Sequence, residues 1–133
     1  MTPFLSKFGP LVGRILMAVI FVISGAGKVA NFGGTAKYMA GHGVPLTELA
    51  LIITIIIELG GAAMLILGWK ARLAAGVLFL WLIPVTLMFH NFWAAPAEQH
   101  MVQQIMFLKN LAIMGGMLYI ATFGSGPCSL ERK

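Results

Sequence analysis

Residues 46–67, LTELALIITIIIELGGAAMLIL, decide the fold of this chain, because a predominantly apolar run of this length can cross a bilayer as one helix. Glu58 lies near the centre of the run. A carboxylate in the middle of a membrane helix costs about 2.5–3.5 kcal/mol on insertion-based scales, so it needs a partner, a proton or a function. The run therefore predicts a spanning helix, and Glu58 marks the place to look for a site.

The composition is that of an integral membrane protein. Of the 133 residues, 59% are hydrophobic and 10% are charged, with a mean hydropathy of +0.93. A soluble domain averages about 45–50% apolar and about 25% charged residues. The net charge of +5 comes from Lys and Arg scattered at the ends of apolar segments, so it does not indicate nucleic-acid binding. The single cysteine, Cys128, excludes an internal disulfide.

Four apolar segments approach the roughly 20 residues that a spanning helix requires, at about residues 11–30, 46–67, 71–89 and 101–123. They use most of the chain, and no connection between them is long enough to fold by itself. We therefore expect residues 1–133 to form one all-α membrane domain, a bundle of four transmembrane helices. Residues 31–45, between the first two segments, are a candidate for a short interfacial helix.

The positive residues also predict an orientation. Cations near the ends of membrane spans are enriched on the cytoplasmic side. If the four spans alternate in direction, one side of the membrane holds six cations and the other holds Lys28 and Lys37. Both termini are therefore expected in the cytoplasm, on the same side as Lys7, Arg14, Lys70, Arg72, Arg132 and Lys133.

Three cations lie within or at the ends of the other apolar segments: Arg14, Lys28 and Lys109. A helical rise of about 1.5 Å per residue places Lys109 above Glu58 and Arg14 below it, and either could pair with the carboxylate. Arg14 and Lys28 lie near span ends, where their side chains can also extend to the lipid headgroups. Two interpretations stay open: an ion pair that fixes helix register, and a site that handles a proton or a ligand.

A second polar cluster surrounds the third connection. His90 ends the third apolar segment, and His100, Gln103, Phe107 and Asn110 share one face of the fourth, which we expect to point inward. His90 and His100 are the residues that could ligate haem or copper. Neither belongs to a spacing motif for a metal, so we predict no metal site.

Several motifs in succession resemble the DoxX family of small bacterial membrane proteins. Besides Arg14, they are SGAGK at 24–28, Phe32, Met39, GVP at 43–45, ELGG at 58–61, LGWKAR at 67–72, HNFW at 90–93, FLKNL at 107–111, GG at 115–116 and GSGPCSL at 124–130. The resemblance implies a four-helix protein of the bacterial inner membrane with cytoplasmic termini, in a redox or detoxification context. The positions carried over from the family motifs are Arg14, Lys28, Glu58, His90, Lys109 and Asn110.

Three functions compete. In the first, the chain is a component of a membrane redox system and forms a quinone pocket, with donors from His90, Lys109 and Asn110 beside Phe107 and with Glu58 relaying a proton. The chain has no flavin or dinucleotide motif, so electrons would come from redox partner proteins, and catalysis by this chain is left open. The second is a small-molecule binding or proton-coupled transport bundle, which for transport would need a homo-oligomer. The third is a structural membrane scaffold.

Overall fold

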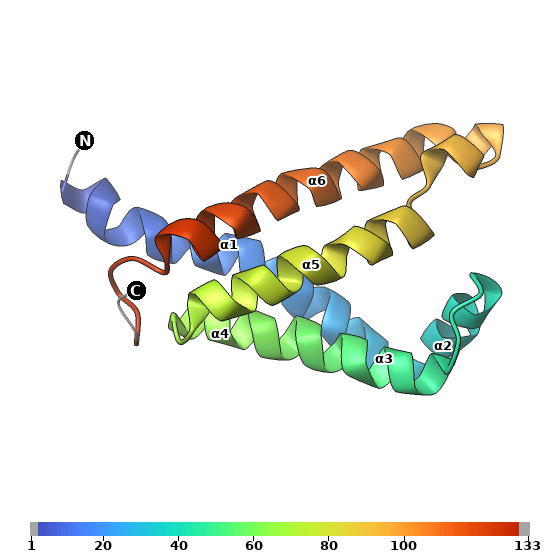
Figure 1. Ribbon diagram of the computed structural model, residues 1–133, viewed down its shortest axis with the longest axis horizontal. Coiled ribbons are helices and arrows are strands. Elements are labelled where there is room, and N and C mark those ends of the chain that lie inside the picture. The colour runs from blue at the N-terminus through green and yellow to red at the C-terminus, as the bar shows by residue number, and fades with distance from the viewer. Residues whose placement is uncertain (1–2, 131–133) are drawn as a thin grey trace.

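The computed structural model describes residues 3–130, and the regular secondary structure of these residues is entirely helical. These residues form four long helical runs, which can be followed in Figure 1. They are α1 (Pro3–Ala30), the continuous run of α3 (Thr47–Ile55), a π-helical turn (Ile56–Gly60) and α4 (Gly61–Leu67), then α5 (Ala71–Phe89) and α6 (His100–Phe123). By length and composition, all four can cross a membrane. The predicted class, an all-α protein with four membrane spans, is confirmed.

The first span differs from the prediction at its start. Helix α1 begins at Pro3 and continues through Pro10. A proline suits the first turn of a helix, because that turn has no hydrogen-bond partner for a backbone N–H. Pro10 lies inside α1, and the helix extends on its N-terminal side beyond the segment starting near residue 11 that hydropathy marked.

Shorter elements join the spans. Helix α2 (Phe32–Gly41) lies in the first connection, where a short helix was predicted, while its place at the membrane interface stays a prediction. Two 3-10 turns, Phe92–Ala94 and Ala97–Gln99, connect α5 to α6. Helix α5 ends at Phe89, where His90 leaves the helical conformation, and Pro96 lies between the two turns in an extended conformation.

The core lies where α1, α4, α5 and α6 meet. Its buried side chains include several alanines, and small residues allow membrane helices to approach closely when hydrophobic burial does not drive their association. At Gly61, for example, a Cβ would lie 3.0 Å from Leu78 Cδ1 of the neighbouring helix. The members of the core are Ala18, Phe21, Ala62, Leu65, Ala71, Ala74, Ala75, Leu78, Leu82 and Met117.

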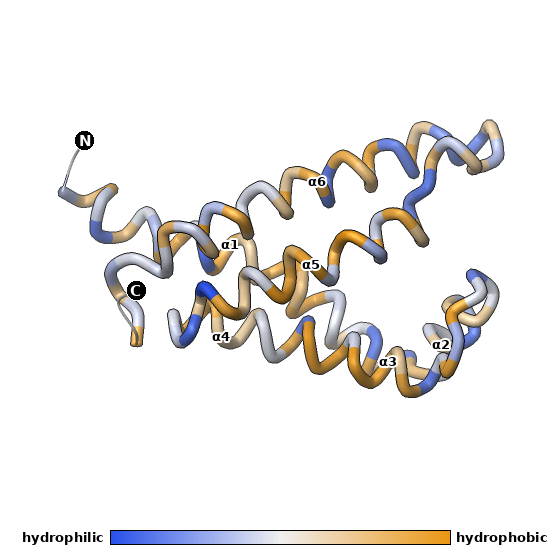
Figure 2. Tube along the Cα trace, viewed as in Figure 1, coloured by the Kyte–Doolittle hydropathy of each residue, from blue (hydrophilic) through white to orange (hydrophobic). Residues whose placement is uncertain are grey.

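The two ends of the bundle differ. The start of α1, the α4–α5 turn and the C-terminal tail lie together, and the Cys128 thiol donates to the Lys7 carbonyl at 3.7 Å. At the opposite end, the ribbons of α5 and α6 spread away from α3 (Figure 1), and the rings of Tyr38 in α2 and Phe89 in α5 meet across the space between them. Figure 2 shows apolar residues along all four spans and hydrophilic ones gathered mainly at turns and helix ends. This distribution suits helices surrounded by lipid.

Candidate functional site

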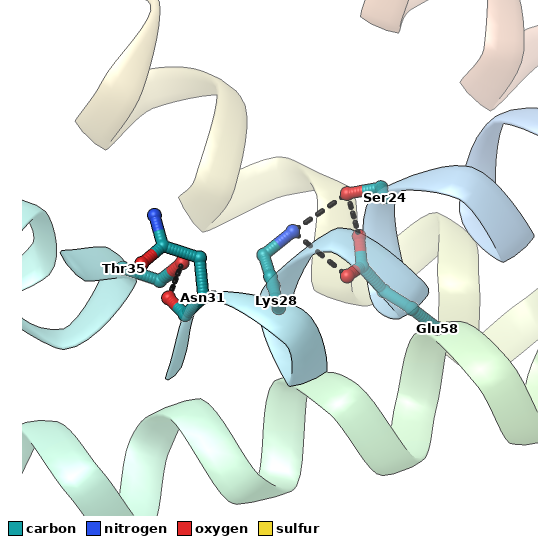
Figure 3. Close-up of polar contacts among 5 residues, drawn as sticks. All are labelled: Ser24, Lys28, Asn31, Thr35 and Glu58. Carbon is teal, nitrogen blue, oxygen red and sulfur yellow. Dashed lines mark hydrogen bonds and ion pairs between the residues drawn. The ribbon is translucent and has the colours of Figure 1, made fainter. Parts of the chain in front are cut away.

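Glu58 is buried, with 3% of its surface exposed, and lies in the π-helical turn between α3 and α4. Both of its carboxylate oxygens have partners on α1 (Figure 3). Lys28 Nζ lies 2.8 Å from Oε1, and Ser24 Oγ donates to Oε2 at 3.0 Å. Lys28 Nζ also donates to Ser24 Oγ at 2.6 Å, which closes a three-residue network. Single π-helical turns within α-helices occur frequently at functional sites.

The local sequence explains why this network forms. Ser24 and Lys28 are four residues apart, so they lie one above the other on the same face of α1. Gly25, beside them, is buried against the π-helical turn. A Cβ at Gly25 would lie 2.7 Å from Leu59 Cδ2, so only glycine lets α1 approach this closely. The close approach brings the ammonium and hydroxyl groups within bonding distance of Glu58.

Neither of the two partners that helical rise suggested for Glu58 is bonded to it in the described part of the chain. Arg14 lies 14 residues before Lys28 on α1, about 21 Å away along the helix axis. Lys109 Nζ instead lies 3.4 Å from Met106 Sδ on its own helix. Lys28 turns inward to the carboxylate rather than extending to the headgroups.

Arg14 forms a second buried charged centre, near the termini. The residue is 2% exposed, and its Nη1 donates to the Leu65 carbonyl of α4 at 3.1 Å. Nη2 donates to the carbonyls of Cys128 at 2.9 Å and Pro127 at 3.3 Å, and Nε donates to that of Pro10 at 3.4 Å. Arg14 therefore joins α1, α4 and the C-terminal tail through main-chain acceptors.

A cavity of about 380 Å³ opens beside the Glu58 network, between α1, α2, α3, the π-helical turn, α5 and α6. Tyr38 of α2 stacks on Phe89 of α5 with ring centroids 5.7 Å apart, and both rings line the cavity at its α2 end. Its polar lining consists of Ser24, Lys28, Thr35, Tyr38, Thr54, Glu58, His90, Lys109 and Asn110. Its apolar lining consists of Ile20, Phe21, Ile23, Met39, Trp81, Leu82, Val85, Phe89 and Ile113.

The cavity brings together some of the remaining predicted residues. Asn110 is 6% exposed and its Nδ2 donates to Thr86 Oγ1 at 3.1 Å, which ties α6 to α5. His90 Nδ1 lies 2.9 Å from Gln103 Oε1. His90 and Asn110 line the cavity, whereas Gln103 reaches it only through His90.

His100 and Phe107 are not part of the cavity lining. Both rings pack against Phe92, each with a centroid distance of 5.4 Å, in an aromatic cluster that also contains Trp93. His90 and His100 therefore have different neighbours. Within residues 3–130, no three His, Cys, Asp or Glu side chains come together in a group that could hold a metal ion.

The sequence-based prediction missed several lining residues. Ser24 could have been found, because it precedes Lys28 by one helical turn and shares its face. Tyr38, Met39 and Trp81 had no such signal. Tyr38 and Met39 reach the cavity because α2 folds back over one end of the cavity. Trp81 reaches it because the rotation of α5 about its own axis turns this side chain inward.

The profile of the DoxX family matches residues 9–91, which include Ser24, Lys28, Glu58 and His90. The chain belongs to the DoxX family. Helix α6, with Lys109 and Asn110, lies outside the matched residues.

Several proteins are similar to this DoxX chain over most of its length. Inner membrane protein YphA of Escherichia coli K12 is 33% identical over 123 residues, covering 92% of this chain and 88% of the relative. Inner membrane protein YqjF of the same organism is 36% identical over 128 residues, covering 96% and 93%. The Surfeit locus protein 4 homolog of Schizosaccharomyces pombe is 30% identical over 125 residues, covering 92% of this chain and 36% of that protein. No solved structure matches the chain significantly.

Together, the family match, the two inner-membrane relatives and the four candidate spans identify a multi-pass protein of the bacterial inner membrane. This agrees with the location predicted from the sequence.

Proposed function

We propose that this DoxX-family protein is a component of a membrane redox system that binds a quinone headgroup in the cavity beside Glu58. The observation that carries the proposal is the cavity itself, within a bundle of membrane spans. Small-molecule sites are typically apolar hollows of about 300–1,000 Å³ with a few convergent polar groups, and this cavity has that character. A quinone dissolved in the bilayer would have direct access to a site between the membrane spans.

The lining supplies the groups that a quinone headgroup needs. Phe21, Trp81 and Phe89 offer aromatic surfaces for the ring, and Tyr38 and Lys109 offer donors for its carbonyl oxygens. Reduction of a quinone to a quinol takes two electrons and two protons. Redox partner proteins would supply the electrons, and Glu58 would relay protons through Ser24, to which it is hydrogen-bonded.

Trp81 provides a direct binding assay, because it is the only one of the three tryptophans among the cavity-lining residues that the structure describes. In a Trp69→Phe/Trp93→Phe background in nanodiscs, a short-chain quinone should quench Trp81 fluorescence saturably. Quenching that stays linear with quinone concentration, as for simple partition into lipid, would contradict the proposal.

A carboxylate substitution tests the proton relay. Glu58→Gln should retain quinone binding but lower the rate of quinol formation in membranes carrying the chain by about tenfold or more, because the relay group is lost. Glu48→Gln is the matched control, since Glu48 is exposed at the start of α3. If E58Q forms quinol at the rate of the wild type, Glu58 is not a relay.

The alternative functions make different predictions for the same cavity. A small-molecule transporter would give substrate flux in proteoliposomes that contain this chain alone. A structural scaffold would lose folded protein when Glu58 is substituted, with no quinone binding by the wild type. The Lys28–Glu58 ion pair supports the scaffold function in one respect, because it fixes the register between α1 and the π-helical turn.

A further inference from the structure

Lys109 is a cation within a membrane span that has no anionic partner among the described residues. It lies nine residues after His100, about 14 Å along the axis from the start of α6. Lys109 lines the cavity and is also exposed at the surface of the bundle, and its ammonium lies 3.4 Å from Met106 Sδ. The carboxylate nearest in depth, Glu58, is already paired with Lys28. A charge left without a partner at such a depth is unfavourable.

The cavity therefore has an excess of positive charge. Lys28 and Lys109 both line it, against the single carboxylate of Glu58. In a low-dielectric surrounding, an unbalanced charge attracts a counter-charge strongly. The lining thus favours an anionic group next to Lys109.

Two separate hollows lie along the seam between α1 and α6, and residues of both helices line each of them. Ile23 both lines the cavity and is 68% exposed, so the cavity reaches the lipid-facing surface at α1. Along the same seam, a second hollow of about 210 Å³ lies between Met17 of α1 and Gly116 of α6. Glycine at 116 makes room there, because a Cβ would lie 2.6 Å from Met17 Cε.

We propose that the cavity also binds a long-chain carboxylic acid, with its carboxylate on Lys109 and its acyl chain along the α1–α6 seam. The proposal uses the same cavity as the proposed quinone site but does not depend on quinone binding. A charge-assisted bond from the ammonium would balance the excess charge, and the single chain would occupy apolar surface that the helices leave uncovered.

The depth and charge of Lys109 favour a fatty acid over two other occupants, a phospholipid and a second copy of this chain. A phospholipid phosphate resides in the headgroup region, whereas Lys109 lies well inside its span. A second copy of this chain offers no suitable described carboxylate, because Glu48 and Glu98 lie at span ends and Glu58 is buried. A fatty acid brings one carboxylate on one flexible chain to the required depth.

The test uses Trp81 in the Trp69→Phe/Trp93→Phe background, in phosphatidylcholine nanodiscs, with chain-brominated palmitate as the quencher. Quenching should saturate, and unlabelled palmitate should compete at least about tenfold better than hexadecanol, which lacks the carboxylate. Equal competition by hexadecanol would overturn the proposal, and so would stronger competition by phosphatidic acid, which would identify a phospholipid site. This comparison needs no variant of Lys109, so it does not depend on how such a variant folds.

Variants then locate the carboxylate. Lys109→Met should weaken palmitate binding about tenfold or more, and Lys109→Arg should retain it. Lys37→Met should not change it, because Lys37 is exposed and does not line the cavity. Unchanged binding by K109M would overturn the assignment. A dimer that dissociates in K109M, together with no palmitate binding, would instead make Lys109 an oligomer contact. Palmitate binding without saturable quinone quenching would contradict the proposed function and leave this inference standing.

Discussion

Arg14 and Glu58 are buried to almost the same extent, 2% and 3% exposed, but their surroundings differ in kind. The Arg14 guanidinium donates only to main-chain carbonyls, which do not titrate and are fixed in place by the backbone. Glu58 is held by two side chains, Lys28 and Ser24, on the wall of a cavity. The comparison teaches that burial of a charge does not by itself indicate a functional site. Arg14 also borders a hollow, of about 210 Å³, so free space beside a charge is not sufficient either. The type of partner, side chains at Glu58 and main-chain carbonyls at Arg14, is what distinguishes the candidate site from the structural contact.

The largest expected effect comes from replacing Arg14, which joins α1, α4 and the C-terminal tail. Arg14→Met leaves the carbonyls of Leu65, Pro127 and Cys128 without their donor, and hydrogen bonds to charged groups contribute about 1.5–3 kcal/mol each. We expect the free energy of unfolding in mixed detergent micelles to fall by about 3 kcal/mol or more. Arg14→Lys is the matched control, because the lysine ammonium can still donate to some of these three carbonyls. Wild-type stability in R14M would mean that the tail does not depend on Arg14.

An intermediate effect is expected at the Glu58 network. Glu58→Gln or Lys28→Met leaves one charge without its partner, and each should lower the free energy of unfolding by about 1–3 kcal/mol. The double variant should recover much of that loss, because neither charge remains. The double-mutant cycle in the same micelles measures the coupling. Simple additivity of the two losses would show that the pair does not fix register between α1 and the π-helical turn.

The smallest effect is expected at Gly68, which supports the Arg14 centre. Its φ is +70°, and an added Cβ would meet both Ser129 and the Arg14 guanidinium. Gly68→Ala should therefore lower the free energy of unfolding by about 1–2 kcal/mol. Gly115→Ala is the control, since nothing lies within 4 Å of its Cβ position in helix α6, and it should be neutral or slightly stabilising. Equal effects of the two substitutions would argue against a crowded joint at Gly68.

The candidate site was only partly predictable from the sequence. The predicted intramembrane polar site consisted of Arg14, Lys28, Glu58, Lys109 and Asn110. All of these except Arg14 line one cavity, together with His90 of the second predicted cluster. Their role in function stays a prediction. The pairing within the centre was not predictable, because helical rise gives the depth of a residue but not the direction in which its side chain points. Depth favoured Lys109 and Arg14 as partners, whereas rotation of α1 about its axis selected Lys28.

The sequence by itself determined the class of protein, the four spans and the importance of an intramembrane carboxylate. These follow from the cost of placing polar groups in lipid, which depends on local composition and length. The tertiary structure decided that Lys28 and Ser24 hold Glu58, that Arg14 fastens the tail, and that α2 closes one end of a cavity. These arrangements depend on how closely helices can approach one another. That approach is set by individual contacts such as Gly25 against Leu59, between residues far apart in the chain.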